Sequence, residues 1–493
     1  MVRKLSILQV SPEVVPFAKT GGLADVVGSL PLALRELGHG VSVVMPLHRE
    51  VRSSKRKINP VSLRLSVPLG GTRQEAAIYQ GNLSFPKKVP IYFIENESYF
   101  DREYLYGTPQ GDYPDNAERF AFFARAALEM VLALGLKPDV IHCHDWQSAL
   151  VPLYHELFYK ASGHLSATAT VLTVHNLAYQ GVFEPEALAL AGLPQDLFHS
   201  KGIEFYGKVN YLKAGLLYAD FINTVSRKYS QEIQAPEYGY GLDGVLRERS
   251  DYLFGIINGV DYKDWNPATD KYIPANYEAS DLRGKEKCKR ELLKEFKLLG
   301  LEDKPLLGMI SRLAAQKGFD LLAEAADELF ALDVGLIVLG TGDEKYQRLL
   351  AEMAQRYPGK MALSIAFDNR LAHKIEAGCD IFLMPSRYEP CGLNQIYSLK
   401  YGTIPLVRAT GGLDDTVESF DPGTGKGNGF KFFSYSAAEL VEKVNEAVGI
   451  FLHDKANWRK LMQNAVAGDF SWEKSAESYV ELYLKALSHS EAH

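Results

Sequence analysis

The chain has 493 residues, 46% of them hydrophobic and 23% charged, and its formal net charge is −7. These values are ordinary for a folded globular protein, and the length predicts roughly two to four domains, each with its own core. The acidic excess argues against a general nucleic-acid binder, which usually carries a basic excess. It leaves room for a local cationic pocket that binds a small phosphate ligand.

The four cysteines lie far apart and form no CxxC pair, so neither a disulfide framework nor a zinc ribbon is predicted; they are Cys143, Cys288, Cys379 and Cys391. The N-terminus enters an apolar run directly and lacks the longer apolar stretch and cleavage site of a signal peptide. No stretch approaches the roughly 18 uninterrupted apolar residues of a membrane span. We therefore expect a cytoplasmic protein without a membrane partner.

In the first half of the chain, short apolar runs alternate with amphipathic segments. A Gly-rich turn leads into a predicted helix over residues 23–37, which Gly38 ends. Apolar residues at three- and four-residue spacings predict one face of a later helix, made of Phe120, Phe123, Ala124, Ala127, Leu128 and Val131. The predicted strands of this half are 5–10, 41–45, 140–143 and 170–174.

The second half repeats the alternation, with predicted strands at 306–310, 334–339, 361–365, 381–384 and 404–407. Strands that alternate with helices predict parallel sheets covered on both faces. Because one sheet rarely holds so many strands, we expect an α/β protein with two doubly wound domains. The boundary is expected near 255–265, where the strand-like FGIIN meets the turn-rich NGVDYKDWNP.

One short segment of the first half is similar to a segment of the second half. The segment 20–25, TGGLAD, resembles the segment 410–415, TGGLDD, and each follows a predicted strand and precedes a helical pattern. The two glycines have two readings: they simply make a tight turn, or the turn exposes N–H groups at a helix N-terminus, where anions bind. Ligands of doubly wound sheets bind at the carboxyl ends of the strands, where both turns are expected.

Charged residues of three loops suit a phosphorylated ligand. Lys19 precedes the Gly21–Gly22 turn, and a lysine there places a point charge on a phosphate. Arg312 and Lys317 stand five apart after a predicted strand, where two cations neutralise a diphosphate. Glu389 lies in a loop between a strand and a helix, where a carboxylate accepts sugar hydroxyl protons. The alternative for Lys19 is an ordinary exposed lysine, and the alternative for Arg312 and Lys317 is a solvated loop.

Two histidine segments lie at the ends of predicted strands. His142, Cys143, His144 and Asp145 have the composition of a metal cluster, but adjacent side chains of a strand point in opposite directions, and the chain offers no matching second half. We therefore do not predict zinc. His175 ends another strand and is placed to reach a cleft; the alternative is a structural histidine.

Together these segments resemble the bacterial glycogen synthase and plant starch synthase family. The matching motifs occur in family order over nearly the whole chain. They are KTGGLADVVGSLP (19–31), HCHDWQSALVP (142–152), TVHNLAYQG (173–181), NTVS (223–226), YGYGLDGVL (238–246), INGVDYKDWNP (257–267), SRLAAQKGFD (311–320), PSRYEPCGLNQIYSLKYGTIP (385–405) and ATGGLDDTV (409–417).

The resemblance implies a glycosyltransferase-B fold, in which two Rossmann-like doubly wound domains face a central cleft. It implies an acceptor-side domain over 1–257, a nucleotide-sugar domain over 258–470 and a final helix, 471–493, that crosses back to the first domain. The implied reaction transfers glucose from ADP-glucose to the non-reducing end of an α-1,4-glucan with retention of configuration, and releases ADP. We expect no nucleic-acid partner.

The resemblance also implies roles for individual residues. Lys19 contacts the donor, Arg312 and Lys317 bind its diphosphate, His175 lies beside the glucosyl centre, and Glu389 holds the donor sugar. The last four form the expected catalytic set. Further substrate contacts are expected from Gly21, Gly22, Asp25, Asn258, Phe367, Leu393 and Asn394.

Two positions depart from patterns common among related enzymes. Many retaining enzymes of this fold carry a second glutamate eight residues after the first; Tyr397 occupies that position here, so no glutamate pair is assigned. Where relatives often carry Gly-Tyr beside the nucleobase, this chain has Ala366 and Phe367. A phenylalanine still stacks on the base but offers no hydroxyl.

The hard step in such a reaction is cleavage of the sugar C1–O bond, with charge developing on the leaving phosphate. Since cationic side chains serve that charge and no Asp-x-Asp motif lies near them, we expect neither a metal nor another cofactor. No carboxylate stands out as a nucleophile, which favours front-face attack. The alternatives are a plastid starch synthase, a glucan phosphorylase with pyridoxal phosphate, and a non-enzymatic glucan-binding or nucleotide-sugar-sensing protein.

Overall fold

A computed structural model describes residues 3–83 and 88–490 of the chain. The chain divides into two compact units. The first unit comprises Met1–Val225, Ser230–Gly259 and Trp472–His493, and the second comprises Ser226–Tyr229 and Val260–Ser471. No helix within the described ranges combines the length and the apolar character that crossing a membrane requires.

The first unit is built on a nine-stranded sheet whose order is β14-β13-β9-β8-β1-β2-β5-β4-β3. Seven of these strands are parallel to one another and mostly buried, so they appear in the sequence as apolar runs. They are β1 (Ser6–Val10), β2 (Gly40–Pro46), β5 (Val89–Glu95), β8 (Val140–His144), β9 (Ala169–Val174), β13 (Phe221–Thr224) and β14 (Leu253–Gly255).

An antiparallel hairpin extends this sheet beyond β5. β3 (Asn59–Leu69) pairs with β4 (Thr72–Leu83), which pairs antiparallel with β5. No strand was predicted here from the sequence. The signal was nevertheless present, because Leu65, Val67 and Leu69 are buried and alternate with more exposed residues, the period-two pattern of a half-buried strand.

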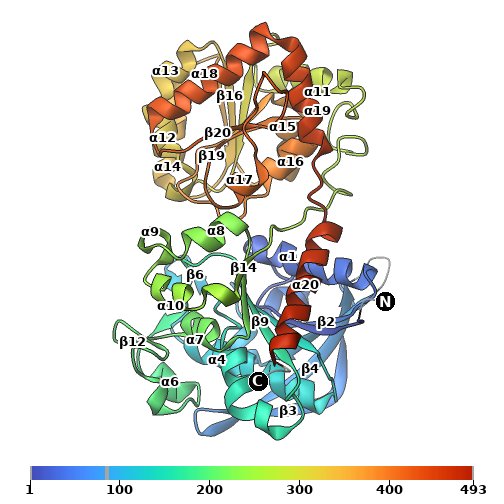
Figure 1. Cartoon of the computed structure of the whole chain (residues 1–493), viewed down its shortest axis with the longest axis vertical. Helices are drawn as coiled ribbons and strands as arrows, with labels where there is room; N and C mark the ends of the chain where they lie inside the picture. The colour runs from blue at the N-terminus through green and yellow to red at the C-terminus, as the bar shows by residue number, and fades with distance from the viewer. Residues whose placement is uncertain (1–2, 84–87, 491–493) are drawn as a thin grey trace. The chain divides into compact units, whose positions relative to one another are not determined.

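The main helices of the first unit cover the parallel sheet, and they include α1 (Gly22–Glu36), α4 (Asn116–Ala133), α7 (Tyr211–Tyr218) and α20 (Trp472–Ser490). The apolar face predicted for α4 is buried, as is most of that helix. Although it ends the chain, α20 packs beside α1 in this unit (Figure 1). Its Tyr479 and Tyr483 share a core with Leu30 and Leu34 of α1.

Shorter elements complete the first unit. They are α2 (Arg49–Ser53), α3 (Glu97–Phe100), β6 (Gly107–Thr108), β7 (Gly111–Asp112), α5 (Leu150–Tyr154), β10 (Val182–Phe183), α6 (Ala187–Leu190), β11 (Glu204–Phe205), β12 (Lys208–Asn210), α9 (Pro236–Gly239) and α10 (Asp243–Glu248). β10, β12 and β11 form a small antiparallel sheet.

The second unit contains a six-stranded parallel sheet with the order β17-β16-β15-β18-β19-β20. Successive residues of its strands face opposite cores: Leu306 belongs to a cluster with Ile375 and Leu292, while Leu307 belongs to one with Phe330 and others. The strands are β15 (Leu306–Ile310), β16 (Gly335–Gly340), β17 (Met361–Ile365), β18 (Ile381–Met384), β19 (Ile404–Arg408) and β20 (Phe430–Phe432).

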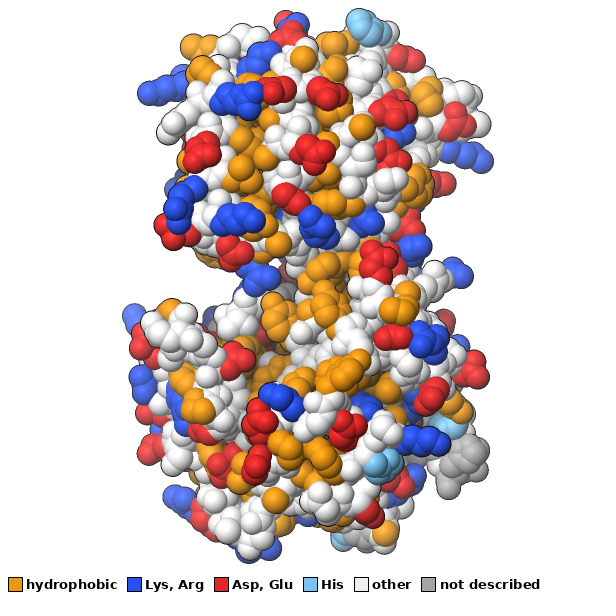
Figure 2. Space-filling model, turned by 90° about the vertical axis from the view of Figure 1, so that its left-hand side faces the viewer, with side chains coloured by type: hydrophobic (Ala, Val, Ile, Leu, Met, Phe, Trp, Pro, Cys, Tyr) orange, Lys and Arg blue, Asp and Glu red, His pale blue; other side chains and the backbone are white. Residues whose placement is uncertain are grey.

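Helices cover this sheet on both faces (Figure 1). They are α11 (Arg283–Glu295), α12 (Phe319–Glu324), α13 (Ala326–Ala331), α14 (Glu344–Arg356), α15 (Asn369–Gly378), α16 (Asn394–Lys400), α17 (Gly411–Thr416), α18 (Ala437–His453) and α19 (Lys455–Ala467). Two α/β units with parallel sheets confirm the predicted fold class. Figure 2 shows acidic and basic side chains interspersed over the visible face of each unit.

Candidate active site

In the first unit, β8 and β9 are parallel neighbours, so the residues that follow them meet at one edge of the sheet. The backbone N–H of His175, after β9, donates to Oδ1 of Asp145, after β8, at 2.7 Å. Nδ1 of His144 lies 3.1 Å from Nε2 of His175. His175, directly after the predicted strand 170–174, was a predicted site residue, whereas Asp145, two residues after the predicted strand 140–143, was assigned no role.

The histidines of this cluster are neutral. Burial lowers the pKa of His175 to about 3 and the pKa of His142 to about 3. Burial also lowers the pKa of His144 well below its usual value. The bond between His144 and His175 therefore joins two uncharged imidazoles, one donating and one accepting. His175 is suited to hydrogen-bond a sugar, and not to serve as a cation.

His142 is held by the body of the unit. Its Nδ1 lies 2.8 Å from the hydroxyl of Tyr483 on α20, and its Nε2 lies 2.7 Å from Oγ1 of Thr173 on β9. Both ring nitrogens are thus engaged by protein hydroxyl groups, which leaves no His142 lone pair for a metal ion. Burial also raises the pKa of the neighbouring Cys143 thiol.

The Lys19 turn begins α1, with Gly21 as the N-cap. The backbone N–H groups of Thr20 and Gly21 donate to the carboxylate of Glu13, the Gly21 bond being 3.3 Å long. The hypothesis that this turn exposes its N–H groups to an anion is therefore wrong for these two amides. The Glu13 carboxylate already occupies the position of the anion at the positive end of the helix.

The other side of this turn is open. A Cβ atom on Gly21 or Gly22 would meet no atom within 4 Å. Nζ of Lys19 lies 2.7 Å from a carboxylate oxygen of Asp25, and their side chains are 49% and 37% exposed. Lys19 and Asp25, two predicted donor contacts, are therefore brought together beside space that a ligand can enter.

The second glycine pair, Gly411–Gly412, supports a neighbouring loop. Gly411 has φ +46°, and a Cβ there would lie 1.9 Å from the carbonyl oxygen of Glu389. The N–H of Gly412 donates to the carbonyls of Glu389 and Pro390, each at 3.1 Å. A side chain fits at neither glycine, so the tight-turn reading describes this copy. Its effect is to fix the backbone of Glu389.

In the second unit, the structure joins two predicted catalytic residues. Nζ of Lys317 lies 2.6 Å from Oε2 of Glu389, with side-chain exposures of 19% and 9%. The hydroxyl of Ser386, which the sequence analysis missed, donates to the same oxygen at 3.2 Å. Lys317 follows β15 and Glu389 follows β18, and these strands are parallel neighbours. Arg312, in the same loop as Lys317, is exposed and has no ion pair within the described ranges.

The two loops are also tied through their backbones. The N–H of Arg387 donates to the carbonyl of Gln316 at 2.8 Å, and Nε2 of Gln316 donates to the carbonyl of Tyr388 at 3.0 Å. Nδ2 of Asn394 donates to the carbonyl of Ile310, the last residue of β15, at 2.5 Å. These bonds fix the relative positions of the loops that carry Lys317 and Glu389.

The remaining predicted contacts come from different elements of the two units. Leu393 is the N-cap residue of α16, and Phe367, after β17, is 90% exposed. Asn258, after β14 in the first unit, is 6% exposed, and its Oδ1 has no hydrogen-bond partner among the described residues. The roles that the resemblance assigns to them stay predictions.

Tyr397 packs where related enzymes carry a second glutamate. Its ring stacks on Trp265 with the centroids 4.0 Å apart and the planes 7° apart. The other face of Trp265 stacks on His373 at 3.9 Å. This three-ring stack gives Tyr397 a packing role that a glutamate cannot take.

Known proteins show the same organisation. Residues 6–248 match the family model described as starch synthase catalytic domain, and residues 293–465 match that of glycosyl transferases group 1. The glycogen synthase of Koribacter versatilis is 52% identical over 476 residues, 96% of each chain. The glycogen synthase of Thermotoga maritima is 48% identical over 488 residues, 98% of this chain and 99% of that one.

Among solved structures, the catalytic domain of starch synthase IV from Arabidopsis thaliana, bound to ADP and acarbose, is similar with a TM-score of 0.88. It is 34% identical, and the match covers 99% of this chain and 100% of that one. Sucrose-phosphate synthase from Thermosynechococcus elongatus shares the fold, with a TM-score of 0.56 and 18% identity, over 98% of this chain and 100% of that one.

The two parallel-sheet units and their loop-borne charged residues are those of a glycosyltransferase of the GT-B fold. The sequence identity to glycogen synthases over the full length of the chain defines the family more narrowly. The chain belongs to the glycogen synthase and starch synthase family of retaining glucosyltransferases. The predicted resemblance, fold and enzyme class are confirmed.

Proposed function

We propose that this protein transfers glucose from ADP-glucose to the non-reducing end of an α-1,4-glucan, with retention of configuration and release of ADP. The observation that carries the proposal is the Lys317–Glu389 pair on the two loops after β15 and β18, with the exposed Arg312 in the first loop. ADP as the nucleotide is supported by its presence in the similar starch synthase structure. The cytoplasmic location and the lack of a nucleic-acid partner stay predictions.

The chemistry follows from the charges. As the sugar C1–O bond breaks, negative charge grows on the leaving diphosphate, and preorganised cations stabilise it. Arg312 and Lys317 provide these cations, with Lys317 shared between the diphosphate and the Glu389 carboxylate. Because Glu389 is committed to Lys317 and Ser386, we assign it to a sugar hydroxyl and not to attack at C1. The leaving phosphate then takes the acceptor's proton in front-face attack.

A transfer assay tests this function. Radiolabelled ADP-glucose and UDP-glucose are each incubated with a maltooligosaccharide, and the label in the lengthened glucan is measured. We expect transfer from ADP-glucose, release of the label by an amylase specific for α-1,4 bonds, and formation of ADP. No transfer, or glucan breakdown that requires inorganic phosphate, would contradict the proposal; the second result, with absorbance of a pyridoxal cofactor, would indicate a phosphorylase.

We also propose that the reaction needs no metal, since side-chain cations serve the diphosphate. Activity after exhaustive treatment with EDTA is the measurement. We expect it to stay unchanged. Loss of activity that Mg²⁺ or Mn²⁺ restores would show that a metal takes part.

A further inference from the structure

Glu13 organises the turn that carries Lys19. Glu13 follows β1 in the chain and is 4% exposed. The carboxylate accepts hydrogen bonds from the N–H groups of Thr20 and Gly21 and, at 3.0 Å, from the Thr20 hydroxyl. A negative charge at this end of α1 is favourable for the helix. The position of Glu13 therefore determines the position of the turn.

Tyr106 supplies the remaining donor. Its hydroxyl lies 3.2 Å from Oε1 of Glu13, a residue 93 positions away in the chain. Burial and the Glu13 carboxylate raise the pKa of Tyr106 well above its usual value, so the phenol stays protonated and donates. Oε1 of Glu13 thus accepts hydrogen bonds both from the turn, through the Thr20 hydroxyl, and from Tyr106.

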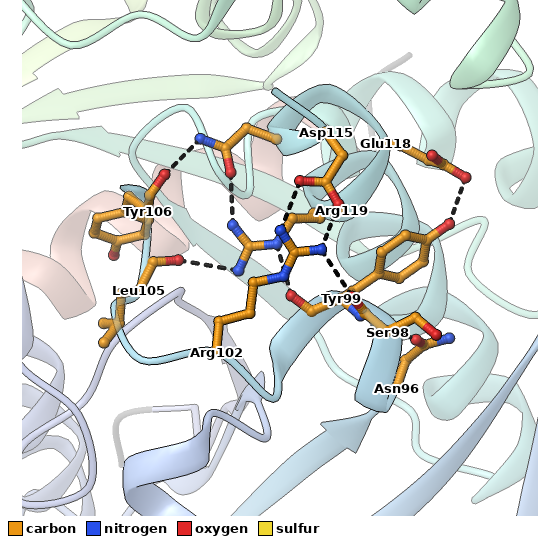
Figure 3. Close-up of polar contacts among 10 residues, drawn as sticks. Asn96, Ser98, Tyr99, Arg102, Leu105, Tyr106, Asp115, Glu118 and Arg119 are labelled. Carbon is orange, nitrogen blue, oxygen red and sulfur yellow. Dashed lines mark hydrogen bonds and ion pairs between the residues drawn. The ribbon is translucent and has the colours of Figure 1, made fainter. Parts of the chain in front are cut away.

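The segment around Tyr106 is held by a buried arginine (Figure 3). Arg119, on α4, is 0% exposed and donates to the carbonyl of Tyr99 at 2.7 Å, to Oδ1 of Asn116 at 2.6 Å and to the carbonyl of Leu105 at 3.0 Å. Nδ2 of Asn116 in turn donates to the carbonyl of Tyr106 at 2.8 Å. Two adjacent backbone carbonyls are therefore anchored from one turn of α4.

None of these three acceptors of Arg119 is a carboxylate. Burial lowers the pKa of Arg119 to about 10, which still leaves it a cation at neutral pH. The nearby carboxylate of Asp115 pairs with Arg102, at 2.6 Å, instead (Figure 3). A buried cation that binds carbonyl groups of one loop fixes that loop, because each carbonyl would otherwise lose its hydrogen bond.

We propose that Tyr106 is a positioning residue for the Lys19–Gly22 turn, acting through Glu13 and held in place by Arg119. The inference rests on the proposed function, since the turn's contact with the nucleotide sugar belongs to that proposal. The inference adds that the segment around Tyr106, far from the turn in the sequence, determines how well the turn contacts the nucleotide sugar. Without the Tyr106 hydroxyl, the Glu13 carboxylate is held only by donors of the turn itself and loses its hydrogen bond to the rest of the unit.

The chain offers a matched control in Tyr99. Its hydroxyl also donates to a carboxylate, Oε1 of Glu118 at 2.5 Å, and it lies in the same cluster (Figure 3). Glu118 has no hydrogen bond to the turn among the described residues. Tyr99→Phe and Tyr106→Phe therefore each remove one hydroxyl from one carboxylate, and only the second carboxylate holds the Lys19 turn.

The kinetic test compares the two variants with the wild type. We expect Tyr106→Phe to lower kcat/KM for ADP-glucose about tenfold and Tyr99→Phe to change it less than about twofold, with similar Tm values and an unchanged KM for glucan. Equal effects of the two variants would overturn the inference. So would a Tyr106→Phe defect confined to the KM for glucan, since that indicates direct contact with the acceptor.

A double-mutant cycle tests the route through Glu13. If Tyr106 acts only through that carboxylate, adding Tyr106→Phe to Glu13→Gln should change kcat/KM less than about twofold. Full additivity would overturn the inference. Thr20→Ala, which removes one donor to Glu13 from the turn, replaces Glu13→Gln if that variant does not fold.

Hydrogen exchange separates this inference from the proposed function, because it needs no activity. We expect the Thr20 and Gly21 amides to exchange about tenfold faster in Tyr106→Phe than in Tyr99→Phe. Unchanged exchange would overturn the positioning role even in an active transferase. An inactive wild-type protein with faster exchange in Tyr106→Phe would contradict the proposed function alone.

Discussion

Lys317 and Glu389 lie 72 residues apart in the chain, yet Nζ of the lysine is 2.6 Å from Oε2 of the glutamate. The pair forms because β15 and β18 are adjacent, so the loops after them meet. The pair therefore lies at the carboxyl ends of parallel strands, where doubly wound sheets bind their ligands, with side chains only 19% and 9% exposed.

The first prediction concerns this pair. Glu389→Gln keeps the shape but removes the charge that orients Lys317, so we expect kcat to fall about 30- to 1,000-fold, or about 2–4 kcal/mol in the transition state. The control is Asp380→Asn, which breaks the buried Lys289–Asp380 pair, 2.8 Å, in the same unit. That variant should have a lower Tm, and its folded fraction should keep the wild-type kcat. A Glu389→Gln enzyme with near wild-type kcat would contradict the assignment.

The second prediction concerns Arg312. Because its guanidinium is exposed and has no ion pair within the described ranges, Arg312→Ala should change the free energy of unfolding by less than about 0.5 kcal/mol. Its kcat/KM should fall about 30- to 1,000-fold, since charge on the leaving diphosphate loses a partner. The kcat/KM of Arg312→Lys should lie between those of the wild type and Arg312→Ala, because an ammonium does not bind two oxygens in the planar manner of a guanidinium.

The matched control for Arg312 is Arg348→Ala, a surface arginine of the same unit, 69% exposed and paired with Glu344. It should leave both stability and kcat/KM unchanged. If Arg312→Ala retains more than about a third of wild-type kcat/KM, a loss under about 0.7 kcal/mol, the diphosphate role of Arg312 fails.

Local pattern was sufficient for most of the parallel strands, although β5, β13 and β20 were not predicted. The predicted ranges 306–310, 361–365 and 381–384 coincide with β15, β17 and β18. β15 and β18 are buried over nearly their whole length and therefore appear in the sequence as apolar runs between turns, while the edge strand β17 is only partly buried. The hairpin β3–β4 was missed because its alternation was not weighed, although Leu65, Val67 and Leu69 carried it.

Site contacts were harder to predict, since they depend on residues that only the fold brings together. Motif position identified Lys317 and Glu389, but their direct contact follows from strand order, which the sequence analysis did not predict. Nothing near Glu13 in the sequence indicates Tyr106, 93 residues later. The Gly21 amide likewise appeared free for an anion until Glu13 was placed beside it.

The third prediction concerns Phe367, which is 90% exposed although it is a large apolar residue. If it stacks on the adenine, Phe367→Ala should weaken ADP binding by about 1–3 kcal/mol, the range measured for base–aromatic stacking. Phe367→Tyr keeps the ring and should bind ADP at least as well as the wild type. Calorimetric titration with ADP measures both. Unchanged ADP affinity in Phe367→Ala would show that the ring does not contact the base.

The fourth prediction concerns the pH dependence of stability at His142. Burial lowers its native pKa from 6.5 to about 3, while in the unfolded chain the group keeps its ordinary value. Between these values the unfolded state binds more protons, so stability rises with pH there. The contribution of neutral His142 to the free energy of unfolding is therefore complete above pH 6.5 and is lost as the pH falls toward 3.

His142→Gln isolates this effect, because glutamine does not titrate and the other groups cancel in the difference. Between about pH 7.5 and about pH 5.5, the wild type should lose about 1.4 kcal/mol of unfolding free energy relative to the variant. Urea unfolding at both pH values measures the difference, which should stay constant from about pH 7.5 to about pH 8.5. A difference that does not change down to about pH 5.5 would mean that folded His142 protonates normally. The hydroxyl groups of Tyr483 and Thr173 would then hold a cation, and the neutral histidine cluster around His175 would need another explanation.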